Sequence, residues 1–145
     1  MILPISLTIA GAAGLLTLWL AMRVSMVRRA RKILVGDGGD PVLLGRIRAH
    51  ANFTENTPLV LILLALVEFA RGTSFWLWLI GAFYILGRIA HAYGMDAGQS
   101  QVARLRLRAV GMGITLATIL TMSIYALSTP YLSRGTITTE LVPAG

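Results

Sequence analysis

Residues 46–70 read RIRAHANFTENTPLVLILLALVEFA, a polar stretch that leads directly into strongly apolar sequence. The apolar part, from about residue 57 to 70, has only about 14 residues, whereas a helix needs roughly 20 to cross the hydrocarbon of a bilayer. The helix must therefore begin earlier and carry part of the polar stretch into the membrane. Asp40 followed by Pro41 is a typical helix start, because aspartate caps free N–H groups and proline fits the first helical position. We expect one helix over about residues 41–70.

The rest of the chain is similarly apolar. Of its 145 residues, 56% are hydrophobic and only 13% are charged, and the mean hydropathy of +0.74 is high for a soluble domain. Three further apolar segments, at about 2–22, 75–92 and 109–127, are long enough to be membrane helices. We expect an all-α bundle of four transmembrane helices over residues 1–128, followed by a flexible extramembrane tail at 129–145.

Positive charge is concentrated at two of the connections between these segments. The formal net charge is +7, which in a soluble protein would suggest a nucleic-acid partner. However, residues 23–48 hold seven of the 13 Lys and Arg residues and residues 88–108 hold four more, so both clusters flank apolar segments. Such clusters mark cytoplasmic loops in membrane proteins. We expect both basic loops in the cytoplasm, both termini outside and no nucleic-acid partner.

Several common kinds of site are excluded by the residue types present. The chain has no cysteine, so it has no disulfide, no thiolate metal ligand and no thiol nucleophile of its own. Its two histidines are far apart and form no HExxH motif, and the glycine-rich segment at 36–40 lacks the GK[ST] of a phosphate-binding loop. We expect no metal, and any thiol chemistry must come from a bound molecule.

Two sets of polar residues are expected to share helix faces near the cytoplasmic end. Arg48, Asn52 and Glu55 follow the i, i+4, i+7 spacing of one helix face, and Arg88 and His91 lie one turn apart on the third helix. Ionisable side chains in a membrane helix are costly and usually face the interior, where they mark a site. Glu55 is the most informative, because an unpaired carboxylate inside the membrane requires an arginine or a cationic ligand group.

The same residues also have simpler interpretations. Contacts among Arg48, Asn52 and Glu55 would join helices without binding anything, since interhelical polar contacts are common. His91 would then be a hydrogen-bonded interior histidine. A basic collar at anionic lipid headgroups would account for Arg28, Arg29, Arg31 and Lys32. The residues alone leave these alternatives open.

Two of these segments resemble a known family. RAHANFTENTP at 48–58 resembles the R-A-x-x-N-x-x-E-x-x-P signature of the MAPEG family, the membrane-associated proteins of eicosanoid and glutathione metabolism. RIAHAYGM at 88–95 resembles the R-x-x-H motif of the family's third helix, and bacterial members look most similar. The resemblance implies a homotrimer in a bacterial inner membrane, with glutathione as co-substrate between adjacent subunits near the cytoplasmic helix ends.

The resemblance also implies roles for individual residues. Arg48, Asn52 and Glu55 would hold glutathione, whose two carboxylates suit arginines and whose ammonium group suits a glutamate. An arginine at the start of the fourth helix would stabilise the thiolate, and our candidates are Arg108 first and Arg104 second. Further contacts to glutathione are expected from Arg28, Arg29, Asn56, His91 and Tyr93.

The implied activity is that of an integral membrane glutathione transferase or peroxidase. It would act on hydrophobic electrophiles or lipid hydroperoxides that arrive through the bilayer. The alternatives are a non-catalytic lipid- or glutathione-binding protein of the same fold and a purely structural four-helix protein. Asn56 and Met95 stand where several eukaryotic members have tyrosines, so eicosanoid specificity is not carried over.

Overall fold

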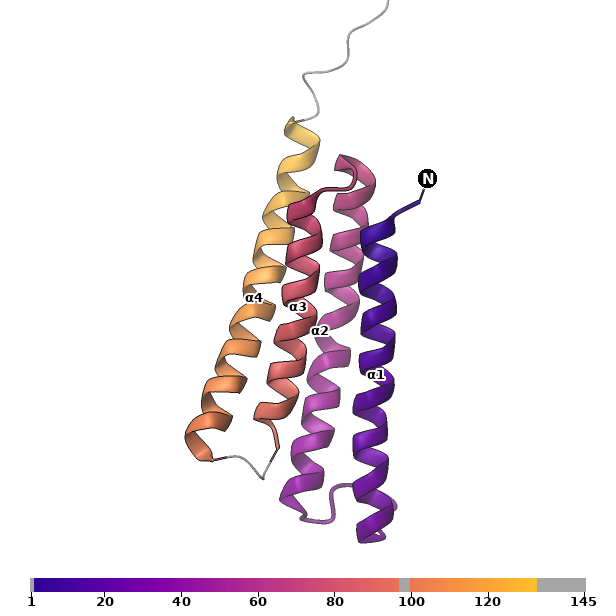
Figure 1. The fold of residues 1–145 in the computed structure, drawn as a ribbon, viewed down its shortest axis with the longest axis vertical. Helices are drawn as coiled ribbons and strands as arrows, with labels where there is room; N and C mark the ends of the chain where they lie inside the picture. Colours follow the sequence, from indigo (N-terminus) through magenta and orange to yellow (C-terminus); the bar gives the residue numbers. More distant parts are fainter. Residues whose placement is uncertain (1, 97–99, 133–145) are drawn as a thin grey trace, which may run out of the picture.

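The computed structural model describes residues 2–96 and 100–132, which form four helices. These are α1 (Pro4–Arg31), α2 (Pro41–Arg71), α3 (Phe75–Gly94) and α4 (Gln101–Leu132), shown in Figure 1. All four are long and apolar enough to cross a membrane. The predicted all-α architecture with four membrane spans is therefore confirmed. Helix α4 continues past the expected boundary at residue 128, and residues 133–145 of the predicted tail lie outside the described part of the chain.

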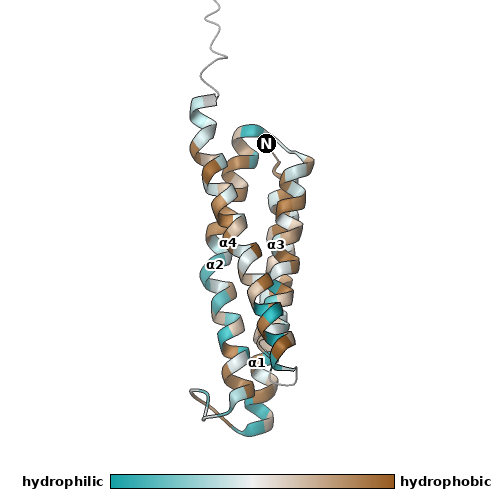
Figure 2. Cartoon of the chain, turned by 90° about the vertical axis from the view of Figure 1, so that its left-hand side faces the viewer, coloured by the Kyte–Doolittle hydropathy of each residue, from teal (hydrophilic) through white to brown (hydrophobic). Residues whose placement is uncertain are grey.

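Successive helices run in opposite directions. The N-terminus, the α2–α3 connection and the end of α4 lie at one end of the bundle, and the two basic connections lie together at the other (Figure 1). Hydrophilic residues gather in the half that leads to the basic end (Figure 2). Buried apolar side chains form two clusters along the interior, one nearer each end. The expected grouping of the basic loops is confirmed, while the side of the membrane on which they lie stays a prediction.

Asp40 begins α2 as expected. Its Oδ1 accepts hydrogen bonds from the backbone N–H groups of Val42 at 2.8 Å and Leu43 at 3.0 Å. Its Oδ2 lies 3.2 Å from Nε of Arg31, the last residue of α1. The pKa of Asp40 is lower than its usual value, chiefly because the Leu43 N–H stabilises the charged form. The Val42 N–H and the Arg31 guanidinium also lower it, whereas burial raises it. The carboxylate therefore both caps α2 and connects it to α1.

The beginning of α1 is capped by a different helix. Glu68, near the end of α2, is only 1% exposed. Its carboxylate accepts hydrogen bonds from the backbone N–H of Ile5 at 3.0 Å, from the N–H and Oγ of Ser6 at 2.7 and 2.6 Å, and from Oγ1 of Thr73 at 3.2 Å. A negative charge at a helix N-terminus satisfies free N–H groups and favours the helix dipole. Glu68 was not among the residues predicted to have a role.

Asp96 connects three segments at the basic end. It follows α3, forms an ion pair with Arg23 of α1, and lies 3.8 Å from Nε of Arg46 of α2. Nη1 of Arg46 also donates to the carbonyl of Arg23 at 2.9 Å. The Arg23 guanidinium lies over the ring of Trp19, 4.6 Å from its centroid. These contacts fix the ends of α1, α2 and α3 relative to one another.

Glycines allow α3 and α4 to approach closely. A Cβ atom added at Gly111 would lie 2.5 Å from the carbonyl oxygen of Gly87 and 2.6 Å from Cβ of His91. A Cβ at Gly94 would lie 2.7 Å from the backbone nitrogen of Arg108. Only a residue without a side chain fits at such contacts. The glycines therefore set the distance between the backbones that carry His91 and Arg108.

Candidate functional site

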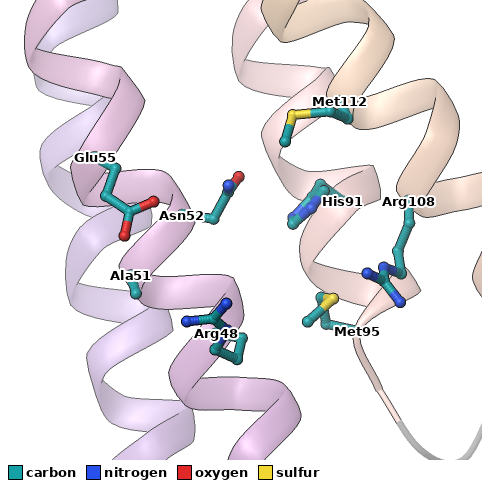
Figure 3. A pocket seen from close by; sticks show the side chains of 8 residues that line it. All are labelled: Arg48, Ala51, Asn52, Glu55, His91, Met95, Arg108 and Met112. Carbon is teal, nitrogen blue, oxygen red and sulfur yellow. The ribbon is translucent and has the colours of Figure 1, made fainter.

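Helices α2, α3 and α4 line a cleft of about 140 Å³ in the half of the bundle that leads to the basic end. Side chains from all three helices point toward it (Figure 3). Its lining consists of Arg48, Ala51, Asn52 and Glu55 from α2, His91 from α3, Met95 directly after α3, and Arg108 and Met112 from α4. The two polar helix faces expected from the residue spacing therefore face one another across one cleft. Five of the predicted site residues belong to it.

Asn52 is held in position by Arg88. Arg88 is 1% exposed, and its Nη2 donates to Oδ1 of Asn52 at 2.7 Å. Its Nη1 donates to Oγ1 of Thr115 at 3.1 Å. Because arginine has only donors, the carboxamide of Asn52 must turn its oxygen toward Arg88. Its amide N–H groups are thereby left to serve as donors in the cleft.

The cleft and its immediate surroundings carry an excess of positive charge. Within residues 2–96 and 100–132, Arg88 forms no ion pair, and its Nε and the Nδ1 of His91 are buried without a hydrogen-bond partner. Arg48 and Arg108 add two exposed guanidinium groups. Buried polar groups normally have partners, so unpaired ones at a cleft call for a functional explanation. A ligand with acceptor groups would provide it.

Glu55 is the one acidic side chain in the lining of this cleft. It is exposed, and in the described part of the chain it has neither an ion-pair nor a hydrogen-bond partner. Figure 3 places it on α2 one turn from Asn52, at the edge of the same cleft. The lining thus presents two guanidinium groups and one carboxylate to a common space. Such a set can bind a small molecule that carries charges of both signs.

The cleft has no grouped set of metal ligands among the described residues, and it is small for a ligand held by this chain alone. Among the described residues, no three His, Cys, Asp or Glu side chains are grouped closely enough to hold a metal. A volume of about 140 Å³ is also below the roughly 300–1,000 Å³ of ordinary small-molecule pockets. A ligand larger than a few atoms would extend beyond the walls that this chain supplies.

Arg104, the second candidate for the thiolate arginine, does not line this cleft. It lines a neighbouring hollow with Gln101, Leu105 and Arg108, so that only Arg108 contributes to both. Arg104 lies one helical turn before Arg108, which places it closer to the beginning of α4. Of the two candidates, the structure therefore brings only Arg108 together with Arg48, Asn52 and Glu55.

Four other predicted contact residues lie elsewhere in the chain. Tyr93 packs against Trp19 of α1, with ring centroids 5.6 Å apart. It lies two residues after His91, a rotation of about 200° around the helix, so its side chain points away from the cleft. Asn56 donates from Nδ2 to the backbone carbonyl of Asn52 at 2.8 Å. Arg28 and Arg29 line a separate hollow at the end of α1. Within one chain these residues do not join the cleft.

Three residues of the lining were not among the predicted site residues. Ala51, Met95 and Met112 supply apolar surface beside the charged groups. Met95 could have been included, since it continues the i, i+3, i+7 series of Arg88 and His91. Met112 follows Arg108 by one turn, but its part in the cleft depends on how α4 packs. No pattern in the sequence gives that packing.

The chain was compared with known proteins. The sequence model of the MAPEG family matches residues 6–128, a range that contains every residue lining the cleft. Inner membrane protein YecN of Escherichia coli strain K12 is 27% identical over 118 residues, which cover 81% of this chain and 86% of that protein. The protein of the same name in Escherichia coli O6:H1 gives the same values.

Proposed function

The chain belongs to the MAPEG family, and from this premise we propose that it binds glutathione in the cleft between α2, α3 and α4. Bound glutathione would attack hydrophobic electrophiles or lipid hydroperoxides that enter from the bilayer. The observation that carries the proposal is the meeting of Arg48, Arg108 and Glu55 at one cleft. The four apolar helices and the name of the Escherichia coli relative support a location in a bacterial inner membrane.

The charges of the lining complement those of glutathione. The tripeptide has two carboxylates, one ammonium group and one thiol, and the cleft offers Arg48 for a carboxylate, Glu55 for the ammonium group and Arg108 for the sulfur. Arginine binds a carboxylate through paired, charge-assisted hydrogen bonds. Glu55 accepts from the ammonium group, and the amide of Asn52, oriented by Arg88, donates to a ligand oxygen. In this assignment each polar side chain of α2 at the cleft has a specific partner.

Arg108 is the residue that we assign to the thiolate. A free thiol has a pKa of about 8.5. A neighbouring guanidinium lowers this pKa, so a larger fraction of the thiol is present as the reactive thiolate at neutral pH. Buried Arg88 adds positive charge beside the cleft without being exposed to solvent. The thiolate sulfur then forms a bond to the electrophilic carbon while the leaving group departs with its electron pair. The thiol proton passes to solvent.

A homotrimer would complete this site. The cleft is too small to enclose a tripeptide and is open at its edge, where Glu55 is exposed. Walls supplied by an adjacent subunit would enclose the ligand and exclude water from the sulfur. Exposed apolar side chains occur along all four helices and provide surface for both lipid and subunit contacts. Native mass spectrometry in detergent should find a mass of three chains.

The central experiment is a titration of the detergent-purified protein with glutathione while thiolate absorbance is followed. The wild-type protein should bind glutathione and ionise its thiol, and it should conjugate glutathione to an aryl halide. Glu55→Gln should weaken binding about tenfold, because the ammonium group loses its charged acceptor. Asp37→Asn is the matched control, since it also removes one negative charge and Asp37 does not line the cleft. An unchanged dissociation constant in Glu55→Gln would reject the assignment of the ammonium group.

Arg108→Ala separates catalysis from binding. Turnover should fall more than affinity, because the lost interaction is stronger with the thiolate than with the thiol. A variant that binds less glutathione but ionises it normally would contradict the role given to Arg108. If the wild-type protein binds glutathione without ionising it and conjugates nothing, the protein is the non-catalytic binder of the same fold.

A further inference from the structure

The short segment after α3 carries a carboxylate that connects three parts of the bundle. Asp96 forms an ion pair with Arg23 of α1 and lies 3.8 Å from Nε of Arg46 of α2. Within residues 2–96 and 100–132, no other acid forms an ion pair with either arginine. None of the three lines the cleft that this chain forms. The cluster therefore joins helices at the basic end from outside the cleft.

Both arginines depend on this carboxylate for charge compensation. Arg23 is 8% exposed, and its guanidinium lies 4.6 Å from the ring centroid of Trp19 and 5.8 Å from that of Tyr93. Nη1 of Arg23 and Nε of Arg46 are buried without a hydrogen-bond partner. Removing one partner of a buried ion pair is costly, because it leaves the other charge uncompensated. The two guanidinium groups therefore hold the carboxylate of Asp96 in place.

The backbone next to Asp96 packs tightly against two helices of the cleft. A Cβ atom added at Gly45 of α2 would overlap the carbonyl oxygen of Met95. On the other side, a Cβ atom added at Gly94 would lie 2.7 Å from the backbone nitrogen of Arg108 and 2.9 Å from its Cγ. Residues 94–96 are therefore held between α2 and α4 and contact the backbone that carries Arg108.

This segment also contributes directly to the cleft. Met95 and Arg108 both line it, and Figure 3 shows them facing Arg48 across the cleft. A movement of residues 94–96 would thus change one wall and displace the arginine on the same side. The carboxylate that fixes this segment lies one residue beyond Met95.

We propose that Asp96 is a positioning residue for Arg108. Its ion pairs hold residues 94–96 against α4, and this packing keeps the Arg108 guanidinium in place beside the sulfur of glutathione. The assignment rests on the proposed function, in which Arg108 stabilises the thiolate. A misplacement of about 1 Å in an active site can lower the rate on the order of a hundredfold. Asp96 acts through packing and does not itself contact the ligand.

The test compares two substitutions of Asp96 in the full chain in detergent. Asp96→Asn keeps the shape and removes the charge, so it should lower the ionised fraction of bound glutathione and reduce kcat about tenfold. The Kd for glutathione should change much less. Asp96→Glu keeps the charge and should recover most of the turnover. Asp96→Asn combined with Arg108→Ala should lose no more than Arg108→Ala alone, because the two residues act as a unit.

Asp40→Asn is the matched control. Asp40 also pairs with an arginine at the basic end, Arg31, but this pair connects only α1 and α2. The substitution should lower stability and leave thiolate ionisation unchanged. An equal loss of ionisation in Asp40→Asn would show a general effect of stability. Additive losses in the double variant would show that Asp96 does not act through Arg108, and either result would overturn the proposal.

A second measurement needs no glutathione. In protein labelled with ¹³C at the methionine methyl groups, the NMR signal of Met95, identified by Met95→Leu, should move in Asp96→Asn and stay in Asp40→Asn. An unmoved signal would reject the positioning role. If Asp96→Asn does not fold, Arg46→Gln removes the longer of the two pairs and should move the signal in the same direction.

The two proposals can fail separately. A wild-type protein that never ionises glutathione would reject the proposed function. Ionisation that is the same in the wild type and in Asp96→Asn would reject only the positioning role.

Discussion

Nη2 of Arg88 donates to Oδ1 of Asn52 at 2.7 Å, so that a buried cation of α3 orients a cleft residue of α2. This hydrogen bond connects the packing of the bundle with the geometry of the candidate site. The same guanidinium reaches Thr115 of α4 at 3.1 Å. One side chain therefore sets the relative position of the three helices that form the cleft, and changes at Asn52 should affect both folding and binding.

Asn52→Ala should lower the free energy of unfolding by about 1–3 kcal/mol, because Arg88 keeps only one of its two hydrogen-bond partners. Thermal unfolding in detergent would measure the loss. Asn52→Asp should remain close to the wild type in stability, since its carboxylate can pair with Arg88. It should nevertheless bind glutathione more weakly, because the amide donor is lost and negative charge is added. Equal stability of the two variants would contradict this role.

Glu68→Ala should reduce thermal stability strongly, by about 3 kcal/mol or more, because buried donors of Ile5, Ser6 and Thr73 lose their acceptor. Glu68→Gln should have a smaller effect, since one acceptor oxygen remains. Glu55→Gln is the matched comparison, as Glu55 is exposed and should leave the unfolding temperature unchanged. The two acids of α2 would thus be separated into a folding role and a binding role.

Gly111→Ala should destabilise the protein, because its Cβ would lie 2.5 Å from the carbonyl oxygen of Gly87 and backbone must move to admit it. Gly113→Ala has no heavy atom within 4 Å of the added Cβ. It should be neutral or stabilising by up to about 1 kcal/mol, as expected for alanine in a helix. Melting curves of the two variants provide the comparison, and similar curves would argue against close packing of α3 on α4.

Asp40 should make stability depend on acid pH. Its pKa is lowered in the folded protein, chiefly by the Leu43 N–H. The stabilisation is therefore fully present above the pKa of Asp40 in the unfolded chain, about 3.9. It is lost as the pH falls through the lower pKa of Asp40 in the folded protein. Asp40→Asn, which keeps a capping oxygen, should be less stable than the wild type at neutral pH, and the difference should shrink below about pH 4. A constant difference over that range would exclude the charge as its cause.

The helices of this chain could be predicted because local signals coincide with hydropathy. The expected helix over about 41–70 is observed as Pro41–Arg71, since Asp40 caps its first turn and an apolar run sustains it across a bilayer. Likewise, Ser74 caps α3 through a hydrogen bond from the Leu77 N–H at 3.2 Å. These signals lie within a few residues of the boundary they determine.

The candidate site was partly predictable for a similar reason. Helical spacing alone groups Arg48, Asn52 and Glu55, and the structure places them at one cleft. Spacing does not say which helices meet. Tyr93, which the family resemblance assigned to the site, packs against Trp19 of its own chain, and its contact to glutathione stays a prediction. The role of Glu68 depends on residues more than sixty positions away in the sequence, as its contact to Ser6 spans 62 residues. Such long-range partners follow only from the packed bundle.

Asp96 is the last described residue before residues 97–99, and its two arginine partners belong to α1 and α2. Neutralising it would remove the charge interactions that connect α1 and α2 to the residue after Met95. Gly94, two residues before Asp96, lies against the backbone of Arg108, so loosening the end of α3 would also disturb the position of Arg108. A carboxylate that does not line the cleft thereby helps to hold one of its guanidinium groups in place.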